Sequence, residues 1–470
     1  MLFNSFPYIA LFFPIACSLF FLSNRLLPLF FSRAWLLIAS LAFYALGSRA
    51  VPLLILSIGV NYWIGTHLQK LAAAGNTRHG AARRVLILGL VFNIGLLGWF
   101  KYADFFVWNV NQLTGYQFPL PGIVLPLAIS FYTFQQISFL VDSYRGGIRC
   151  DGWLDYALYV TFFPQLISGP IVRYLEFAPQ LQRWHSARFD FQNASIGLSL
   201  FFTGLVKTAA VAHIFGNWAD QGFSNSDSLS LIDGWTTSLS YTFQIYLDFS
   251  GYTDMALGAA RFFNIELPLN FNSPYQAVNI QDFWRRWHMT LSRFLRDYIY
   301  IPLGGNKRGE VKTGINVILT FLIGGIWHGA GWTFIVWGAL HGIGAALLRV
   351  WWKTGIRLPT VVAAFFTFNF INITWVFFRA ESIEKAMCIL KSMMGCCKLT
   401  GFSILHGIPA ADIIIASISI LTVFLGKNTN SIPGTLKPGA WAALRLTATI
   451  LMALLYLNSS IPKEFLYFDF

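Results

Sequence analysis

The sequence predicts an all-α protein that crosses a membrane many times and forms one domain over residues 1–470. Of the 470 residues, 56% are hydrophobic and only 11% are charged, whereas soluble domains carry roughly 25% charged residues. Apolar runs near the roughly 20 residues that a membrane helix needs recur along the chain. The 33 basic residues exceed the 20 acidic ones, and we assign this excess to cytoplasmic loops rather than to nucleic-acid binding.

Apolar runs predict the membrane-embedded helices, and Gly or Pro interrupts several of them. Such breaks are tolerated only where the backbone is buried in protein or lines a cavity, so we expect broken or re-entrant helices among about 11 to 13 embedded segments. The runs are 7–23, 34–47, 51–68, 85–108, 122–142, 153–172, 195–218, 232–258, 313–327, 331–348, 359–378, 408–426 and 440–457.

Clusters of Lys and Arg orient the chain. Residues 70–84 and 284–312 form the strongest basic loops, and the positive-inside rule places both in the cytoplasm. Counting spans back from the first loop puts the N-terminus outside. Counting forward from the second puts 379–407 and the C-terminus outside.

Within the single domain, three parts are expected. Residues 1–120 supply N-terminal helices, 121–378 the catalytic core, and 379–470 C-terminal helices with an extracytoplasmic aromatic tail. The five cysteines form no CxxC and no cluster with histidine, so the sequence predicts neither a metal site nor a disulfide framework.

His328 is the leading candidate for chemistry. It lies in LIGGIWHGAGWTF, residues 322–334, between long apolar runs. An ionisable side chain in such a segment is costly and by default faces the bundle interior. Four neighbouring glycines let a substrate or another backbone approach, and Trp327 offers a flat apolar wall. A neutral imidazole suits a general base, and a histidine bonded only to a neighbouring helix is the alternative.

Residues 281–303 predict an amphipathic helix at the cytoplasmic surface, and His288 lies within it. Aromatic and Leu side chains fall on one face, and most of the arginines fall elsewhere. Topology and anionic lipid explain this charge adequately. The charge would also suit a donor rich in phosphate, and the two interpretations are compatible. The arginines are Arg285, Arg286, Arg293 and Arg296.

Two further histidines have competing interpretations. His341 either lines the same cavity as His328 or packs between helices. His185, in HSARFD, has the H-x4-D spacing of soluble-face glycerolipid acyltransferases. No phosphate-binding motif of that class follows it, so we interpret the spacing as a coincidence.

Six blocks in this order resemble the membrane-bound O-acyltransferase (MBOAT) superfamily. The resemblance is to its bacterial alginate O-acetyltransferase branch, which includes membrane components of peptidoglycan O-acetylation and relatives that D-alanylate teichoic acid. One block is GGIWHGAGWTFIVWGALHG, and the resemblance runs over most of the chain and includes these blocks. They are 126–146, 161–181, 241–275, 282–306, 324–342 and 375–380.

The resemblance implies a ring of tilted helices around a thin centre, with a central tunnel from the cytoplasm and a funnel outside. His328 takes the position of the essential histidine between them. His288 takes the position of a second polar residue, which is Asn in many eukaryotic members. We expect His328 to act as general base on the acceptor hydroxyl or to relay its proton. We expect His288 to hydrogen-bond the thioester carbonyl or to position the donor.

The donor substrate that these residues imply is a cytoplasmic acyl-CoA, expected to be acetyl-CoA, with no bound cofactor. The four arginines named above are candidates for its phosphates, and Trp327 for contact with it. The tail FLYFDF, residues 465–470, is either an interfacial aromatic anchor or a carrier. A tail of this type recurs in cell-wall acylation proteins of this branch, so Tyr467 is a candidate transient acyl carrier.

The predicted function is therefore O-acetylation of an extracytoplasmic polysaccharide, such as peptidoglycan or alginate, from the bacterial cytoplasmic membrane. A partner transferase of the SGNH type would complete the reaction outside. A transporter is one alternative, but it predicts symmetric pairs of broken helices, which the sequence does not show. A non-catalytic subunit of an export complex, or acylation of a lipid, are the others.

Overall fold

The chain folds almost entirely into helices, as the sequence predicts. In this computed structural model the described residues are 2–75, 80–150, 152–186, 188–396, 403–404, 407–435, 439–459 and 466, and they contain no strand. Eight helices among them are long and apolar enough to cross a membrane, which confirms a multi-pass membrane protein. These are Tyr8–Leu26, Val51–Ala73, Gly80–Thr114, Phe191–Ser224, Glu310–His328, Trp332–Lys353, Thr360–Arg379 and Ala440–Leu457.

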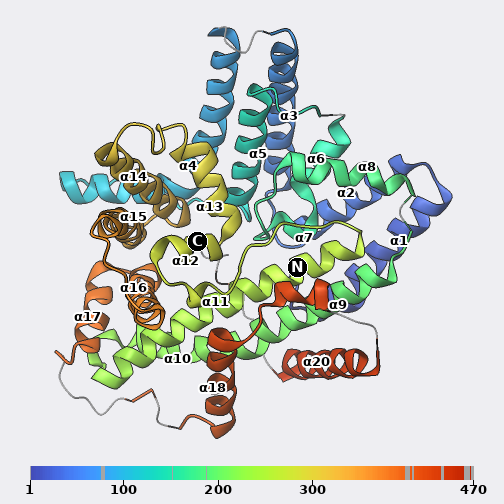
Figure 1. The fold of residues 1–470 in the computed structure, drawn as a ribbon. Coiled ribbons are helices and arrows are strands. Elements are labelled where there is room, and N and C mark those ends of the chain that lie inside the picture. The colour runs from blue at the N-terminus through green and yellow to red at the C-terminus, as the bar shows by residue number, and fades with distance from the viewer. Residues whose placement is uncertain are drawn as a thin grey trace. The chain divides into compact units, whose positions relative to one another are not determined.

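The packing divides the chain into two units. Unit 1 comprises Met1–Phe201 and Thr253–Pro268, and unit 2 comprises Phe202–Tyr252 and Leu269–Phe470. The division falls inside two helices, α9 (Phe191–Val206) and α11 (Leu231–Phe262). The other helices of unit 1 are α1 (Phe13–Leu26), α2 (Leu29–Ala45), α3 (Val51–Ala73), α4 (Gly80–Thr114), α5 (Ile129–Tyr144), α6 (Trp153–Thr161), α7 (Phe163–Leu166) and α8 (Tyr174–Gln182) (Figure 1).

Unit 1 is held together by aromatic packing and a few buried polar contacts. The ring of Phe163 lies 5.6 Å from that of Phe43 and 6.3 Å from that of Tyr8, measured between centroids. Asn61 of α3 and Asn93 of α4 exchange amide hydrogen bonds of 3.2 and 2.6 Å. Because lipid cannot satisfy these amides, each interhelical bond of this kind stabilises a membrane bundle by about 0.6–2 kcal/mol.

The two proline-rich runs of unit 1 are interrupted, as expected. Within 122–142 the helix begins only at Ile129, after Ala128 with a φ of 64°. Run 153–172 contains two short helices, α6 and α7, and no helix follows Leu166 within the run.

Unit 2 contains the candidate histidines His288, His328 and His341. Its helices besides α11 are α10 (His213–Ser224), α12 (Ile280–Arg286), α13 (Met289–Leu295), α14 (Glu310–His328), α15 (Trp332–Lys353), α16 (Thr360–Arg379), α17 (Ile383–Met393), α18 (Ala410–Leu425), α19 (Ile432–Thr435) and α20 (Ala440–Ser459) (Figure 1).

The hairpin of α14 and α15 is the closest helix pair of unit 2. Only residues 329–331 connect the two helices, which pack along their length. A Cβ at Gly338 would lie 2.5 Å from the Phe321 carbonyl oxygen, and one at Gly325 would collide with the Phe334 carbonyl oxygen. Small residues let membrane helices approach in this way. The sequence left open whether a substrate or another backbone approaches these glycines. At Gly325 the approaching group is the backbone of α15.

The amphipathic segment expected over 281–303 is helical but divided. Asn279 caps α12 by accepting the Asp282 backbone N–H at 2.8 Å. At His288 the backbone turns left-handed, with φ 40° and ψ 53°. The Met289 N–H then donates to the Asn270 carbonyl at 2.9 Å instead of continuing the helix. Helix α13 follows, and a π-helical turn over Arg296–Tyr300 ends the segment.

Gly338→Ala should destabilise the protein by about 1–3 kcal/mol, the usual range for overpacking, because its methyl group would meet backbone of α14. Thermal unfolding in detergent measures the effect. The matched control is Gly314→Ala on α14, where the nearest atom is the Ala346 Cβ at 4.0 Å. This control should unfold at or above the wild-type temperature, since alanine favours helix. Equal losses in both variants would contradict the close packing.

Candidate active site

His288 and His328 lie together inside unit 2. His328 is the last residue of α14, and His288 occupies the break between α12 and α13. Their side chains are buried, with 3% of His328 and none of His288 exposed. Their ring centroids are 6.4 Å apart. The structure thus brings together the two residues that the sequence predicts to be catalytic, although they are forty positions apart in the chain.

Aromatic side chains wall the histidine pair. Around His328, Trp327 packs at 4.9 Å, Trp337 at 5.1 Å and Phe378 at 5.2 Å between ring centroids. The ring of Trp327 also lies 6.2 Å from His288. Trp327 is therefore placed against both histidines.

His288 is held by Asn270, a residue that the sequence did not single out. Its Nδ1 lies 3.0 Å from Asn270 Oδ1, which also accepts the backbone N–H and the hydroxyl of Thr290 at 3.3 and 2.9 Å. His288 lies outside the eight candidate spans, and burial lowers its pKa to about 3. The ring is therefore neutral near pH 7. In the sequence, the one feature that could have pointed to Asn270 was its place in the family-like block 241–275.

His341 packs between helices, which decides between its two interpretations. The Trp284 indole N–H donates to His341 Nδ1 at 3.1 Å, and His341 Nε2 lies 3.0 Å from Thr374 Oγ1. Both ring nitrogens thus have partners, and the histidine joins α12, α15 and α16. This arrangement suits a structural residue.

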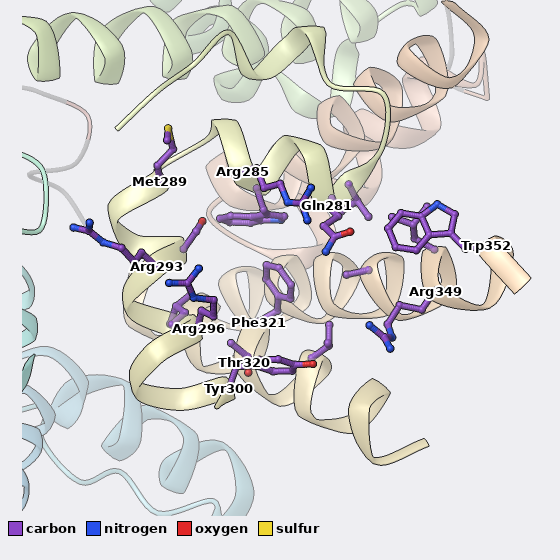
Figure 2. A pocket seen from close by; sticks show the side chains of 17 residues that line it. Gln281, Arg285, Met289, Arg293, Arg296, Tyr300, Thr320, Phe321, Arg349 and Trp352 are labelled. Atoms are coloured by element: carbon purple, nitrogen blue, oxygen red, sulfur yellow. The ribbon is translucent and has the colours of Figure 1, made fainter. Parts of the chain in front are cut away.

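A cavity of about 530 Å³ lies between α12, α13, α14 and α15, and neither His288 nor His328 is among its lining residues. Four arginines contribute to its lining, and Figure 2 shows Arg285 and Arg296 on one segment and Arg349 on another. Such a concentration of guanidinium groups suits an anionic ligand, because arginine forms bidentate bonds to phosphate. The fourth of these arginines is Arg293.

Three of the four arginines expected from the sequence line this cavity, and one does not. Arg286 instead pairs with Asp282 at 2.8 Å and donates to the Asn272 carbonyl at 3.5 Å. Arg349 was missed, since it is far away in the sequence. It pairs with Glu310 at 3.2 Å. Trp327 is not part of the lining.

The cavity is close to the histidines along two elements. Met289, which lines it, directly follows His288, and Phe321 on α14 lies seven residues before His328. Seven residues of α-helix span about 10 Å. A ligand bound by the arginines therefore needs an extended arm to reach the histidine pair. No cluster of three or more metal-binding side chains occurs among the residues that the structure describes.

Two other sequence candidates lie wholly or partly outside the described residues. Tyr467 is one of them, and for His185 the side chain is not described. Leu466, directly before Tyr467, is described: its N–H donates to Asp248 Oδ2 at 3.2 Å. The next residue on α11 is Phe249, whose ring lies 4.9 Å from that of His288.

A helical multi-pass membrane protein with a buried histidine pair beside a cationic cavity has the parts of a membrane-embedded transferase. Residues 152–383 match the MBOAT, membrane-bound O-acyltransferase family. The chain is 46% identical over 442 residues to the peptidoglycan O-acetyltransferase of Helicobacter pylori, covering 86% of this chain and 81% of that one. It is 40% identical over 403 residues to the probable alginate O-acetylase AlgI of Pseudomonas aeruginosa, covering 84% and 75%.

A further relative, the probable alginate O-acetylase AlgI of Pseudomonas putida, is 36% identical over 501 residues and is matched over 100% of both chains. The chain belongs to the membrane-bound O-acyltransferase family. It is an O-acyltransferase, and the family implies an acyl donor.

His341→Leu should lower stability more than activity. The change leaves the buried Trp284 N–H unpaired, which costs about 1–3 kcal/mol, and it does not touch the histidine pair directly. Thermal unfolding and CoA release per folded molecule measure the two effects. We expect a lower unfolding temperature with CoA release within tenfold of wild type. If CoA release disappears while the unfolding temperature is unchanged, His341 has a chemical role.

Proposed function

We propose that this protein transfers an acyl group, expected to be acetyl, from cytoplasmic acyl-CoA for O-acetylation of an extracytoplasmic polysaccharide. The observation that carries this proposal is the buried histidine pair about 10 Å along α14 from the arginine-lined cavity, within reach of an extended arm. The names of the relatives point to peptidoglycan or alginate as the acceptor. The geometry supports acyl transfer without favouring either polymer.

The donor would bind with its phosphates in the cavity. Arg285, Arg293 and Arg296 on one side and Arg349 on the other supply positive charge for them, and each bond to a charged group is worth about 1.5–3 kcal/mol. The pantetheine arm is neutral and extended. It would run along α14 toward His328, which brings the thioester into the aromatic enclosure.

The histidine pair would perform the two tasks that acyl transfer requires. One is general-base removal of the proton from the attacking hydroxyl, worth about 10²–10⁴-fold in rate, and the other is contact with the donor's thioester. The sequence assigns the first task to His328 and the second to His288. The surrounding aromatic rings would exclude water, so that hydrolysis of the thioester does not compete.

The fold expected for this function places the reaction across the membrane. We propose about 11 to 13 embedded segments, some re-entrant, around a central tunnel. Both chain termini would face the outside of a bacterial cytoplasmic membrane. CoA carries too much charge to cross, so only the acyl arm would enter from the cytoplasm. A partner transferase outside would then deliver the acyl group to the polysaccharide.

Tyr467 is proposed as the carrier between these two sides. The supporting contact is that of its neighbour Leu466 with Asp248, one residue from the ring that packs against His288. In this proposal the residue after Leu466 supplies a hydroxyl to the histidine pair. Tyr467 would then take the acyl group and pass it to the external partner.

Purified protein given acetyl-CoA labelled on the acetyl group should release CoA and become labelled at Tyr467. His328→Ala should lower both signals by at least about 10², the smaller value expected for losing a general base. Tyr467→Phe should abolish the label on the protein. Label that persists in Tyr467→Phe would remove the tail from the mechanism. Unchanged CoA release in His328→Ala would remove His328 from the chemistry, whereas a wild type that releases no CoA would favour a non-catalytic subunit.

Arg285→Ala and Arg349→Ala should each raise the KM for acetyl-CoA by about tenfold or more, because each removes a bond of about 1.5–3 kcal/mol to phosphate. The KM for S-acetylpantetheine, which lacks the phosphates, should not change. Arg286→Ala is the matched control on the same segment, since this arginine lies outside the cavity. Equal effects on both substrates would argue against phosphate binding by Arg285 and Arg349.

A further inference from the structure

A second hollow of unit 2 is a groove of about 1180 Å³ between the end of α15 and the start of α16. The connection between the two helices, residues 354–358, lines one end of it. At the other end the helices approach each other, since a Cβ at Gly344 would lie 2.9 Å from the ring of Phe370. The helix from Gly344 to Lys353 is about 15 Å long. This length is half of the roughly 30 Å hydrocarbon core of a bilayer, which is the depth of one leaflet.

The surface of this α15–α16 groove is mainly apolar. Trp351 and Phe366 contribute large apolar side chains to it. Two hydroxyls in its lining are already bonded to backbone, because Thr367 donates to the Ala363 carbonyl at 2.7 Å and Thr354 to the Trp351 carbonyl at 2.8 Å. The groove therefore suits a hydrocarbon chain better than it suits a nucleotide, which needs polar partners.

One cation lies at the end of the groove where the two helices are connected. Arg357 is the one charged side chain among the described residues that line the groove, and it is exposed. It lies between the candidate spans Trp332–Lys353 and Thr360–Arg379, and thus at a membrane surface. Trp351 and Trp352, at the end of α15, are 40% and 50% exposed, as is usual for tryptophan at a membrane interface. The orientation proposed above makes this surface cytoplasmic.

We propose that the α15–α16 groove binds an anionic phospholipid of the cytoplasmic leaflet. One acyl chain lies between α15 and α16, and the headgroup phosphate contacts Arg357. Basic pockets between membrane helices on the cytoplasmic side bind anionic headgroups in this way, and a guanidinium group forms bidentate bonds to phosphate. The apolar lining, the length of one leaflet and the position of the single cation all fit this occupant.

The groove shares a wall with the arginine-lined cavity. Ile280, Leu348 and Trp352 line both, and Figure 2 shows Trp352 at the opposite end of that cavity from Met289. Since Met289 directly follows His288, the shared wall is the part of the cavity that lies away from the histidine pair. The lipid is therefore not a substrate. Its chain packs behind the three shared side chains and stabilises the donor cavity, a consequence that rests on the proposed function, whereas lipid binding itself does not.

The headgroup contact is tested with full-length protein in detergent, given equal amounts of phosphatidylglycerol and phosphatidylcholine with the same acyl chains. Native mass spectrometry counts the retained lipids. Wild type should retain phosphatidylglycerol over phosphatidylcholine by about fivefold, the preference that one arginine near the headgroup supplies. Arg357→Ala should lose this preference. The matched control is Lys353→Ala, since Lys353 pairs with Glu310 at 3.8 Å and does not line the groove.

The control should keep the wild-type preference. A wild type without preference, a preference that persists in Arg357→Ala, or an equal loss in both variants would each overturn the proposed headgroup site. Displacement of the retained lipid by 3′,5′-ADP would also overturn it, because the groove would then belong to the donor.

The position of the acyl chain is tested by filling the groove. Ala363→Phe places a ring in the lining and should lower the retention of both lipids by at least about tenfold, since loss of burial of a few CH₂ groups costs this much. Val361→Phe adds the same ring on α16 at a side chain that is 81% exposed and outside the lining, so its retention should equal that of wild type. Thermal unfolding verifies that both variants fold. Wild-type retention in folded Ala363→Phe would show that the chain lies elsewhere.

The effect on the donor cavity is measured in nanodiscs. The KM for acetyl-CoA should be about fivefold lower with phosphatidylglycerol than with phosphatidylcholine, the lower end of typical coupling between two sites, and Ala363→Phe should abolish the difference. Equal KM values in the two lipids for wild type would overturn the coupling. If wild type releases no CoA in either lipid, the proposed function fails, and the retention of lipid still decides whether the groove is a lipid site.

Discussion

The close approach of α14 to α15 is the constraint on which the rest of the site depends. With Gly325 and Gly338 at the contact, the two backbones meet without intervening side chains, and α14 ends with His328 against the rings of Trp337 and Phe378. The partner helix also carries His341, which receives the Trp284 indole and so fixes α12. The end of α12 in turn sets the position of His288. Both candidate histidines are therefore placed by one hairpin.

Burial has different consequences for His341 and His288. His341 is buried with both nitrogens bonded, so burial locks it in place. His288 is equally buried but has only one bonded nitrogen among the described residues. The unpaired nitrogen of His288 destabilises the fold. The many well-packed aromatic contacts elsewhere offset this free-energy cost. An active site commonly contains strain and unsatisfied groups of this kind.

The sequence predicted the parts of the structure that follow from periodicity and from family-like blocks. Apolar runs gave the helices, and the cost of an ionisable group in an apolar segment gave His328. The break at His288 was not predictable, because aromatic residues keep a helical period through it and the left-handed turn depends on a bond from Met289 to Asn270. Arg349 and Asn270 were missed for a related reason: each meets its partners only through tertiary packing. From the sequence, Trp327 was expected to contact the donor. Sequence alone could not show that its ring packs against the two histidines.

The left-handed backbone at His288 also limits which side chains can occupy that position. At φ 40° a residue with a Cβ is strained, and Asn, Asp and His tolerate this region better than most other residues. The resemblance implies, as an expectation, that Asn takes the position of His288 in many eukaryotic members. Both belong to the small group that the backbone accepts. Exchange between an amide and an imidazole can thus leave the main chain undisturbed, so that chemistry diverges at this position while the fold is retained.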